Sequence, residues 1–177
     1  MIILMKHSNR KIKRQLRLFA QIPVSLQPKD NPFFIDNMKK YILDLTVTEN
    51  VRLHANYALL KLTSPSLLPE MLPGQFAEIR VDGSPTTFLR RPISINYVDK
   101  QRNEVWFLIQ LVGDGTKRLG AAKQGDIINV VLPLGNSFTM PEKPLDKLLL
   151  VGGGVGTAPM LYLGEQLAKN GSKPTFL

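Results

Sequence analysis

The chain has 177 residues, 44% hydrophobic and 21% charged, which is an ordinary globular composition and enough for one full domain and the start of a second. It has no cysteine, which excludes disulfides and thiolate metal sites. It has only two histidines, which argues against a histidine-based catalytic triad and against a transition-metal site. The net charge is +9, but residues outside 1–37 carry only +4 of it, without a basic and aromatic stripe, so we expect no nucleic-acid partner.

Residues 1–37 hold seven basic and two acidic side chains, a brief helical pattern and then three prolines. One interpretation is a basic arm for an acidic partner. The other, which we favour, is a disordered extension ahead of the first regular pattern. The chain shows neither the apolar core of a signal peptide nor a long apolar span, so we expect a cytoplasmic protein without a membrane contact.

Six β-rich runs follow, each bounded by Gly, Pro, Asn or Asp. They cover residues 41–50, 57–64, 74–83, 91–99, 103–112 and 125–133. Because no long helix separates them, their spacing predicts an antiparallel barrel or sandwich in a domain over residues 38–143. One short helix interrupts the series, and we expect it to begin at Thr116 with Thr116 as its N-cap.

The pattern changes type in residues 144–177. A buried strand over 147–151 precedes a glycine turn, and a helix of about ten residues follows from Ala158, with Pro159 in its first turn. Asn170-Gly171 is expected to close this helix, and residues 174–177 to open another strand. We expect the first strand–helix unit of a nucleotide-binding α/β domain. We also expect it to be truncated, because one such unit cannot bury both faces of a parallel sheet.

Two arginines stand directly before a proline at the start of the fourth run. Pro92 keeps Arg91 extended and belongs at the start or edge of a strand, because it cannot donate to a sheet ladder. We expect the Arg91 guanidinium and the Ser94 hydroxyl to lie on one face of this strand and to suit a diphosphate. Arg90 is expected to point to the other face as a solvated charge. Taken in isolation, the pair is more simply interpreted as surface charge.

Two glycine turns are further candidates for phosphate binding. In residues 113–120, Gly115 lets the backbone approach a ligand, and Thr116 can offer its hydroxyl and its N–H to a phosphate oxygen. After the strand over 147–151, glycines 152, 153, 154 and 156 lead into a helix N-terminus, although Thr157 replaces the third glycine or alanine of the dinucleotide pattern. For each turn, a tight connection packed for steric reasons is the alternative.

Taken together, R-P-x-S, G-x-G-T, P-L-G-N and G-G-G-x-G-x-A-P occur in an order and spacing that resembles the ferredoxin–NADP reductase superfamily. There, a six-stranded FAD-binding antiparallel barrel with a short capping helix precedes a nicotinamide-nucleotide domain. Within the superfamily, residues 38–177 are most similar to electron-transfer subunits of type B dihydroorotate dehydrogenases. The resemblance implies FAD-binding positions at Arg91, Pro92, Ile93, Ser94, Leu108, Ile109, Gln110, Gly115 and Thr116, and NAD-binding positions at Gly153, Gly154, Gly156 and Thr157. The family often has Tyr-Arg where this chain has Ile109-Gln110.

The resemblance also implies a function in pyrimidine biosynthesis. It implies electron transfer between NAD and the FMN-containing catalytic subunit of dihydroorotate dehydrogenase in a hetero-oligomer, with the flavin and no catalytic side chain doing the redox chemistry. Family members hold a 2Fe–2S cluster with four thiolates. This chain has no such ligands, and we expect weak nucleotide binding in its truncated form. The alternatives are a generic flavin reductase, a homologous subunit of another NAD(P)H-dependent iron–sulfur oxidoreductase, and a cofactor-free β-barrel interaction module.

Overall fold

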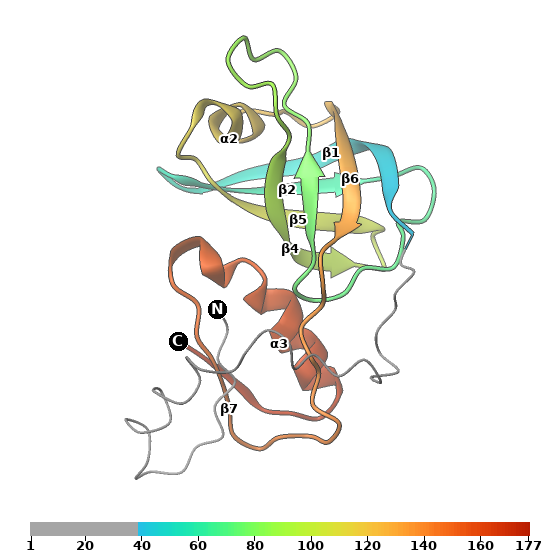
Figure 1. Cartoon of the computed structure of the whole chain (residues 1–177), viewed down its shortest axis with the longest axis vertical. Helices are drawn as coiled ribbons and strands as arrows, with labels where there is room; N and C mark the ends of the chain where they lie inside the picture. Colours follow the sequence, from blue (N-terminus) through green and yellow to red (C-terminus); the bar gives the residue numbers. More distant parts are fainter. Residues whose placement is uncertain (1–38) are drawn as a thin grey trace, which may run out of the picture.

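The computed structural model describes residues 39–177, and the basic extension predicted for residues 1–37 lies outside them. Six strands close into a barrel in the order β1-β2-β5-β4-β3-β6, with every neighbouring pair antiparallel (Figure 1). The strands are β1 (Tyr41–His54), β2 (Tyr57–Thr63), β3 (Phe76–Ile79), β4 (Arg91–Asp99), β5 (Glu104–Gln110) and β6 (Ile127–Leu134). The predicted six-stranded antiparallel barrel is confirmed.

The barrel closes around an apolar core because its strands alternate inward and outward side chains. In β2, Leu60 and Leu62 are fully buried, and Lys61 between them faces outward. In β5, Phe107 and Ile109 are likewise fully buried. Burying a side chain of this size contributes about 1.5–3 kcal/mol, so the inward residues of six strands supply the main stabilisation of the barrel.

Two strands differ from their predicted ranges by more than the others do. β1 continues to His54 because it changes partners, pairing with β6 over residues 41–46 and with β2 over residues 46–54. Irregularities between Val47 and Glu49 and between Arg52 and His54 let it bend around the barrel. β3 is limited to four residues, because only Phe76–Ile79 pairs continuously with β4.

The short helix α2 (Asp114–Leu119) lies between β5 and β6 in the chain and covers one end of the barrel, with Leu119 in the barrel core (Figure 1). Its N-cap is Gly113, so the prediction that Thr116 caps it is wrong. Thr116 is the third helical residue, and its Oγ1 accepts hydrogen bonds from the backbone N–H groups of Val112 and Gly113, both at 3.1 Å. The hydroxyl therefore reaches back to the cap from inside the first turn.

A second, smaller unit follows the barrel along the chain. The strand β7 (Leu148–Leu150), the 3-10 helix η2 (Gly154–Thr157), the helix α3 (Met160–Lys169) and the strand β8 (Pro174–Phe176) follow in order, and β7 and β8 are parallel. The predicted strand–helix–strand order is confirmed. The helix begins at Met160 instead of Ala158, because η2 takes up the preceding residues and Pro159 is the N-cap of α3. At its end, Gly171 has a φ of +87°, which favours glycine.

The two units touch along α3, which packs on the barrel beside β4 (Figure 1). Tyr162 of α3 is 3% exposed, belongs to the core cluster of the barrel, and donates its hydroxyl proton to the Met71 carbonyl at 2.8 Å. A separate apolar cluster joins the inner side of α3 to β7. Within residues 39–177, no helix is long and apolar enough to cross a membrane.

Candidate functional site

The register of β3 and β4 determines which way the first residues of β4 point. Directly opposite residues of an antiparallel pair lie on one face. Arg91 is opposite Ile79, which is fully buried, whereas Ser94 is opposite Phe76, whose alternation places it on the outside of the barrel. Arg91 therefore starts on the inner side, at the open end of the strand, and Ser94 lies on the outer face. The prediction that they share a face is wrong, because they are three positions apart and strand alternation has a period of two.

Arg91 meets the turn that begins α2. A β-carbon added to Gly115 would lie 3.0 Å from Arg91 Cδ and 3.0 Å from Thr87 Cγ2. Glycine thus leaves space for the arginine side chain to lie across the first turn of the helix. None of the ion pairs among residues 39–177 includes Arg91. The structure brings together two segments that the sequence analysis proposed separately, and the charge of Arg91 has no carboxylate partner in the described chain.

The Thr116 hydroxyl is less available to a phosphate than its position in the sequence suggests. Its hydroxyl donates to the Gly113 carbonyl at 3.0 Å, so the expected hydrogen bond from this hydroxyl to a phosphate competes with a bond inside the helix. The N–H groups of the first helical turn have no acceptor within the helix. What remains for an anion is therefore the backbone of Gly115 and Thr116 beside the Arg91 side chain.

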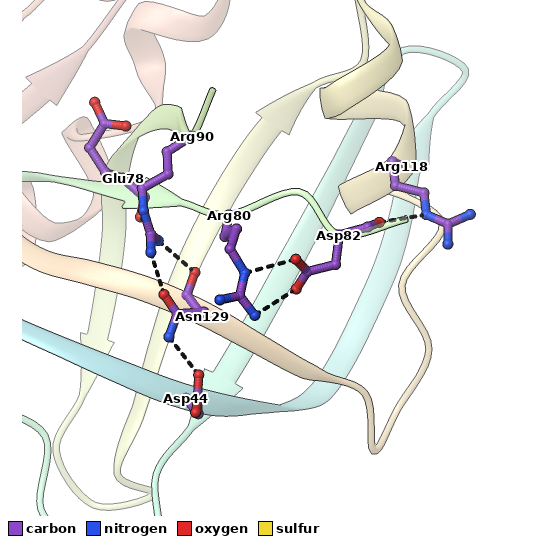
Figure 2. A network of polar contacts seen from close by, with 7 residues as sticks. All are labelled: Asp44, Glu78, Arg80, Asp82, Arg90, Arg118 and Asn129. Carbon is purple, nitrogen blue, oxygen red and sulfur yellow. Dashed lines mark hydrogen bonds and ion pairs between the residues drawn. The ribbon is translucent and has the colours of Figure 1, made fainter. Parts of the chain in front are cut away.

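Arg90 belongs to a structural network, and the prediction of a solvated charge is wrong. Its Nη1 donates to the carbonyls of Glu78 at 3.3 Å and Asn129 at 3.1 Å, and its Nη2 donates to Asn129 Oδ1 (Figure 2). Asn129 Nδ2 in turn donates to Asp44 Oδ1 at 2.6 Å. The partners lie on β1, β3 and β6, so Arg90 holds the entrance of β4 against the barrel and leaves Arg91 free.

A second network holds the loop between β3 and β4 to α2 (Figure 2). Arg80 forms a bidentate ion pair with Asp82, in which Nε lies 2.7 Å from Oδ1 and Nη2 lies 3.0 Å from Oδ2. This hydrogen bonding raises the pKa of Arg80. Arg118 of α2 donates to the Asp82 carbonyl at 3.2 Å. Thr86 Oγ1 donates to Asp114 Oδ2 at 3.1 Å, at the other end of the helix. The loop is thus bonded to both ends of α2.

Thr87 is a candidate that the sequence analysis missed. It lies on this loop, and its Cγ2 is one of the two atoms that an added Gly115 β-carbon would approach most closely. Its backbone N–H donates to Ser84 Oγ at 3.1 Å, which turns the loop toward the helix. No periodicity or spacing in the sequence indicates this contact, since 28 residues separate Thr87 from Gly115.

The remaining predicted flavin positions are divided between the two faces of β4 and β5. The pair Ile95–Phe107 is in register and fully buried, so the residues next to it, Ser94 and Leu108, lie on the outer face. Gln110 follows Leu108 on this face, and the exposed Pro92 precedes Ser94. Ile93 and Ile109 point inward, and Ile109 is fully buried in the barrel core. Their side chains therefore do not line the outer face, and only their backbone can contribute to it.

In the glycine loop of residues 152–157, the part that forms η2, residues 154–157, lies next to β5. Gly152 is constrained by packing, because an added β-carbon would lie 3.0 Å from Thr157 Cα. Gly154 has a φ of +56°, and Thr157 Oγ1 donates to its carbonyl at 2.8 Å. Gly153 and Gly156 have nothing within 4 Å of an added β-carbon. Steric packing thus explains Gly152, the positive φ explains Gly154, and open space surrounds the added β-carbon at Gly153, Gly154 and Gly156.

Polar contacts between the barrel and the second unit lie beside the outer face of β4 and β5. Tyr97 of β4 donates its hydroxyl proton to Glu165 Oε1 of α3 at 2.7 Å, which raises the pKa of Tyr97 to about 12. Burial disfavours the ionised form of Glu165, but the hydrogen bonds from Tyr97 and Lys169 outweigh it and lower the Glu165 pKa. Among residues 39–177, no group of three His, Asp or Glu side chains could hold a metal ion.

Comparisons with known sequences identify close relatives. No protein-family model matches the chain. It is 45% identical over 104 residues to the electron transfer subunit of dihydroorotate dehydrogenase B (NAD⁺) from Shouchella clausii, a match of 58% of this chain and 40% of that protein. It is 37% identical over 133 residues to the subunit of the same name from Fusobacterium nucleatum, a match of 75% of this chain and 51% of that protein. The matches thus cover about half or less of these relatives.

Solved structures with the same fold include two oxidoreductases of more than 25% identity. Phthalate dioxygenase reductase, described as a modular structure for electron transfer from pyridine nucleotides to [2Fe-2S], is 26% identical with a TM-score of 0.62, over 76% of this chain and 42% of that one. An NADH-dependent reduced ferredoxin–NADP oxidoreductase is 29% identical with a TM-score of 0.65, over 75% and 46%. The chain is a homologue of dihydroorotate dehydrogenase B electron transfer subunits, built on the barrel of the ferredoxin reductase-like proteins.

Proposed function

We propose that the barrel binds FAD and that the protein transfers electrons between a nicotinamide nucleotide and a dihydroorotate dehydrogenase catalytic subunit. The names of its homologues support this function, because they are electron transfer subunits of dihydroorotate dehydrogenase B (NAD⁺). The proposal includes a hetero-oligomer with the catalytic subunit and a place in pyrimidine biosynthesis. The cytoplasmic location expected from the sequence stays a prediction.

The observation that carries the proposal is the contact of Arg91 with the Gly115 turn. A diphosphate needs opposite charge and exposed N–H groups at short range. Arg91 has no carboxylate partner among residues 39–177, and Gly115 removes the side chain that would block its approach to the turn. The proposed diphosphate site therefore consists of the Arg91 guanidinium and the backbone of the turn at Gly115, with the Thr87 side chain beside them.

The isoalloxazine ring would lie on the outer face of β4 and β5, where Ser94 provides a hydroxyl, Leu108 an apolar surface and Gln110 an amide. When bound, FAD supplies the redox chemistry, exchanging hydride with the nicotinamide and single electrons with the partner. The residues of this chain bind and orient the cofactor, and none is required as an acid or a base. This division of roles agrees with the scarcity of histidine.

The glycine loop with Gly153, Gly154, Gly156 and Thr157 is the proposed contact for the nicotinamide nucleotide. Its position beside β5 would place that nucleotide next to a flavin on the outer face. A cysteine-ligated iron–sulfur cluster cannot be held by these 177 residues, which contain no cysteine. Single-electron exchange therefore depends on a centre bound by other residues.

Substituting Arg91 by alanine tests the FAD site. We expect Arg91→Ala to weaken FAD binding by on the order of 2–3 kcal/mol, because charge-assisted hydrogen bonds to the diphosphate are lost. The measurement is the ratio of flavin absorbance to protein after gel filtration. Arg102→Ala is the matched control, since the Arg102 side chain is 69% exposed and lies in the turn after β4. Stoichiometric flavin in Arg91→Ala would contradict the assignment.

A generic flavin reductase is the second candidate, favoured by the reductases among the structural neighbours. The two functions differ in the electron acceptor. Dihydroorotate should reduce the bound FAD only when the FMN-containing catalytic subunit is added together with the residues that bind the iron–sulfur centre, whereas the activity of a generic reductase would not depend on that subunit. A colourless protein that takes up no added FAD would instead favour a cofactor-free interaction module.

A further inference from the structure

Asn96 is the extra residue of a β-bulge in the proposed flavin-binding strand. The register between β4 and β5 passes from Ile95–Phe107 to Tyr97–Trp106, so two steps along β4 correspond to one step along β5. Bulges redirect a side chain and are common beside functional sites. Asn96 is 6% exposed, and a buried carboxamide needs hydrogen-bond partners. Asn96 lies two positions after Ser94 on the same strand, so its side chain is positioned by the segment that also presents Ser94.

The partner of Asn96 lies in the second unit. Asn96 Nδ2 donates to the carbonyl of Ala158 at 2.6 Å across 62 residues of chain. Because the acceptor is a carbonyl, only the amide nitrogen can make this bond, and the orientation of the carboxamide is thereby settled. Ala158 is 1% exposed and caps the C-terminal end of η2, which carries the glycine loop. The bond thus joins the flavin strand to the end of the nucleotide loop.

We propose that Asn96 is a positioning residue that holds the glycine loop in register with the outer face of β4 and β5. The inference rests on the proposed function, because this register would set the distance between a nicotinamide on the loop and a flavin on the strands. The other polar bonds between the units, from Tyr97 to Glu165 and from Tyr162 to Met71, are made by α3 and do not touch the loop. Among these donors, only Asn96 bonds to Ala158, the residue that directly follows the loop.

Loss of the Asn96 donor should weaken the attachment of the glycine loop to β4. A buried carbonyl without a partner is unfavourable, and a carboxylate facing it adds repulsion. Asn96→Asp changes the donor while keeping the size and shape of the side chain. Two amides report on the loop, since the Gly156 N–H donates to Gly153 and the Ala158 N–H donates to Val155, both at 3.0 Å. If the loop is released, these amides open to solvent more often.

Hydrogen exchange of these two amides is the first test, with Tyr97→Phe as the control that removes a neighbouring contact between the units. At neutral pH we expect Asn96→Asp to lower their protection about tenfold and Tyr97→Phe to leave it unchanged. As the pH falls through the pKa of the introduced carboxyl, its neutral form can donate to Ala158, and protection should return. In Asn96→Ala the two amides should lose protection at every pH. This variant replaces Asn96→Asp in the test if Asn96→Asp does not fold.

Titration of the FAD-loaded protein with NADH is the second test. We expect the half-saturating concentration to rise about tenfold in Asn96→Asp and to stay unchanged in Tyr97→Phe, with equal FAD content in all forms. Unchanged amide protection, or unchanged nucleotide affinity despite lost protection, would overturn the positioning role.

The two tests also separate this inference from the proposed function. Absence of FAD in the wild type would refute the flavin assignment, while the exchange data would still decide whether Asn96 anchors the loop. Absence of NADH binding by the FAD-loaded wild type would refute the nicotinamide half of the function for these residues, and the exchange data would again decide whether Asn96 anchors the loop.

Discussion

Two adjacent arginines at the start of β4 have opposite roles. Arg90 is fixed by carbonyl and amide oxygens of the barrel, whereas Arg91 extends toward the α2 turn without a carboxylate partner among the described residues. Strand alternation sends neighbouring side chains to opposite sides, so one residue can anchor the strand while the next is presented to a ligand. The anchor keeps the backbone of Arg91 in place.

This division predicts a stability effect for Arg90. We expect Arg90→Ala to lower the free energy of unfolding by roughly 2–3 kcal/mol, because several partly buried oxygens lose a charged donor. Chemical denaturation followed by the fluorescence of Trp106, the one tryptophan, measures it. Arg102→Ala, at an exposed position, should change stability by less than about 0.5 kcal/mol. Equal stability of the two variants would mean that the Arg90 network does not anchor β4.

At the residue scale, sequence reasoning identified the proposed ligand arginine and misplaced its neighbours. Arg91 could be singled out because the following proline restricts it to an extended conformation at a strand start. The partners of Arg90 on β3 and β6 could not be foreseen, since the barrel order that brings them together is not encoded in any local pattern. The inward side of Ile109 follows from alternation, but the implied flavin positions included it because of the family resemblance.

At the scale of elements, the fit of α2 against the start of β4 depends on Gly115. We expect Gly115→Ala to weaken FAD binding, because the new methyl group lies 3.0 Å from Arg91 Cδ and displaces the guanidinium. The fold should tolerate the change, since alanine is favoured over glycine within a helix by about 1 kcal/mol, which offsets part of the strain. Flavin content after gel filtration and the denaturation midpoint are the two measurements.

Gly113→Ala is the matched control for this substitution. It lies two residues earlier, has a φ of −124°, and has nothing within 4 Å of an added β-carbon. Alanine is a poorer N-cap than glycine, so this control should reduce stability slightly while flavin content stays the same. Equal flavin content in Gly115→Ala and Gly113→Ala would show that the approach of Arg91 to the turn does not matter for binding.

Most elements were predictable because their patterns are local. The alternation of apolar and polar residues predicted β4 with its observed bounds and β2 to within one residue, and it predicted β5 with three residues too many. The apolar run at 147–151 predicted β7. The longer β1 was not predictable, because its bends depend on partners in two other strands. The start of α3 was placed two residues early, because a 3-10 turn and the first turn of an α-helix have similar sequence preferences.

At the scale of the whole molecule, the two units are joined through aromatic side chains of β4 and α3. The rings of Tyr97 and Tyr162 meet edge to face with centroids 6.0 Å apart, and Tyr97 also lies 4.9 Å from Trp106. Such pairs add about 0.5–1.5 kcal/mol beyond the burial of their surface. Because α3 follows the glycine loop directly, this contact and the Asn96 bond together determine where the loop lies relative to the barrel.

The charge of Glu165 makes the contact between the barrel and α3 sensitive to low pH. Its pKa is lowered in the folded protein, because hydrogen bonds from Tyr97 and Lys169 outweigh the effect of burial. A carboxylate whose folded pKa lies below its unfolded value of 4.5 contributes stability that is present above that pH. The contribution is lost as the pH falls through the folded pKa. We therefore expect the stability of the wild type to decline on acidification from about pH 5.

Comparison of Glu165→Gln with the wild type isolates this contribution. The glutamine cannot ionise, so the variant should be less stable at neutral pH and its stability should fall less steeply below pH 4.5. Glu142→Gln, at an exposed position in the linker before β7, should follow the wild-type curve. Denaturation followed by Trp106 fluorescence suits the measurement, because Trp106 contacts Tyr97. Parallel curves for Glu165→Gln and the wild type would mean that the bond from Tyr97 to Glu165 does not join barrel and helix in solution.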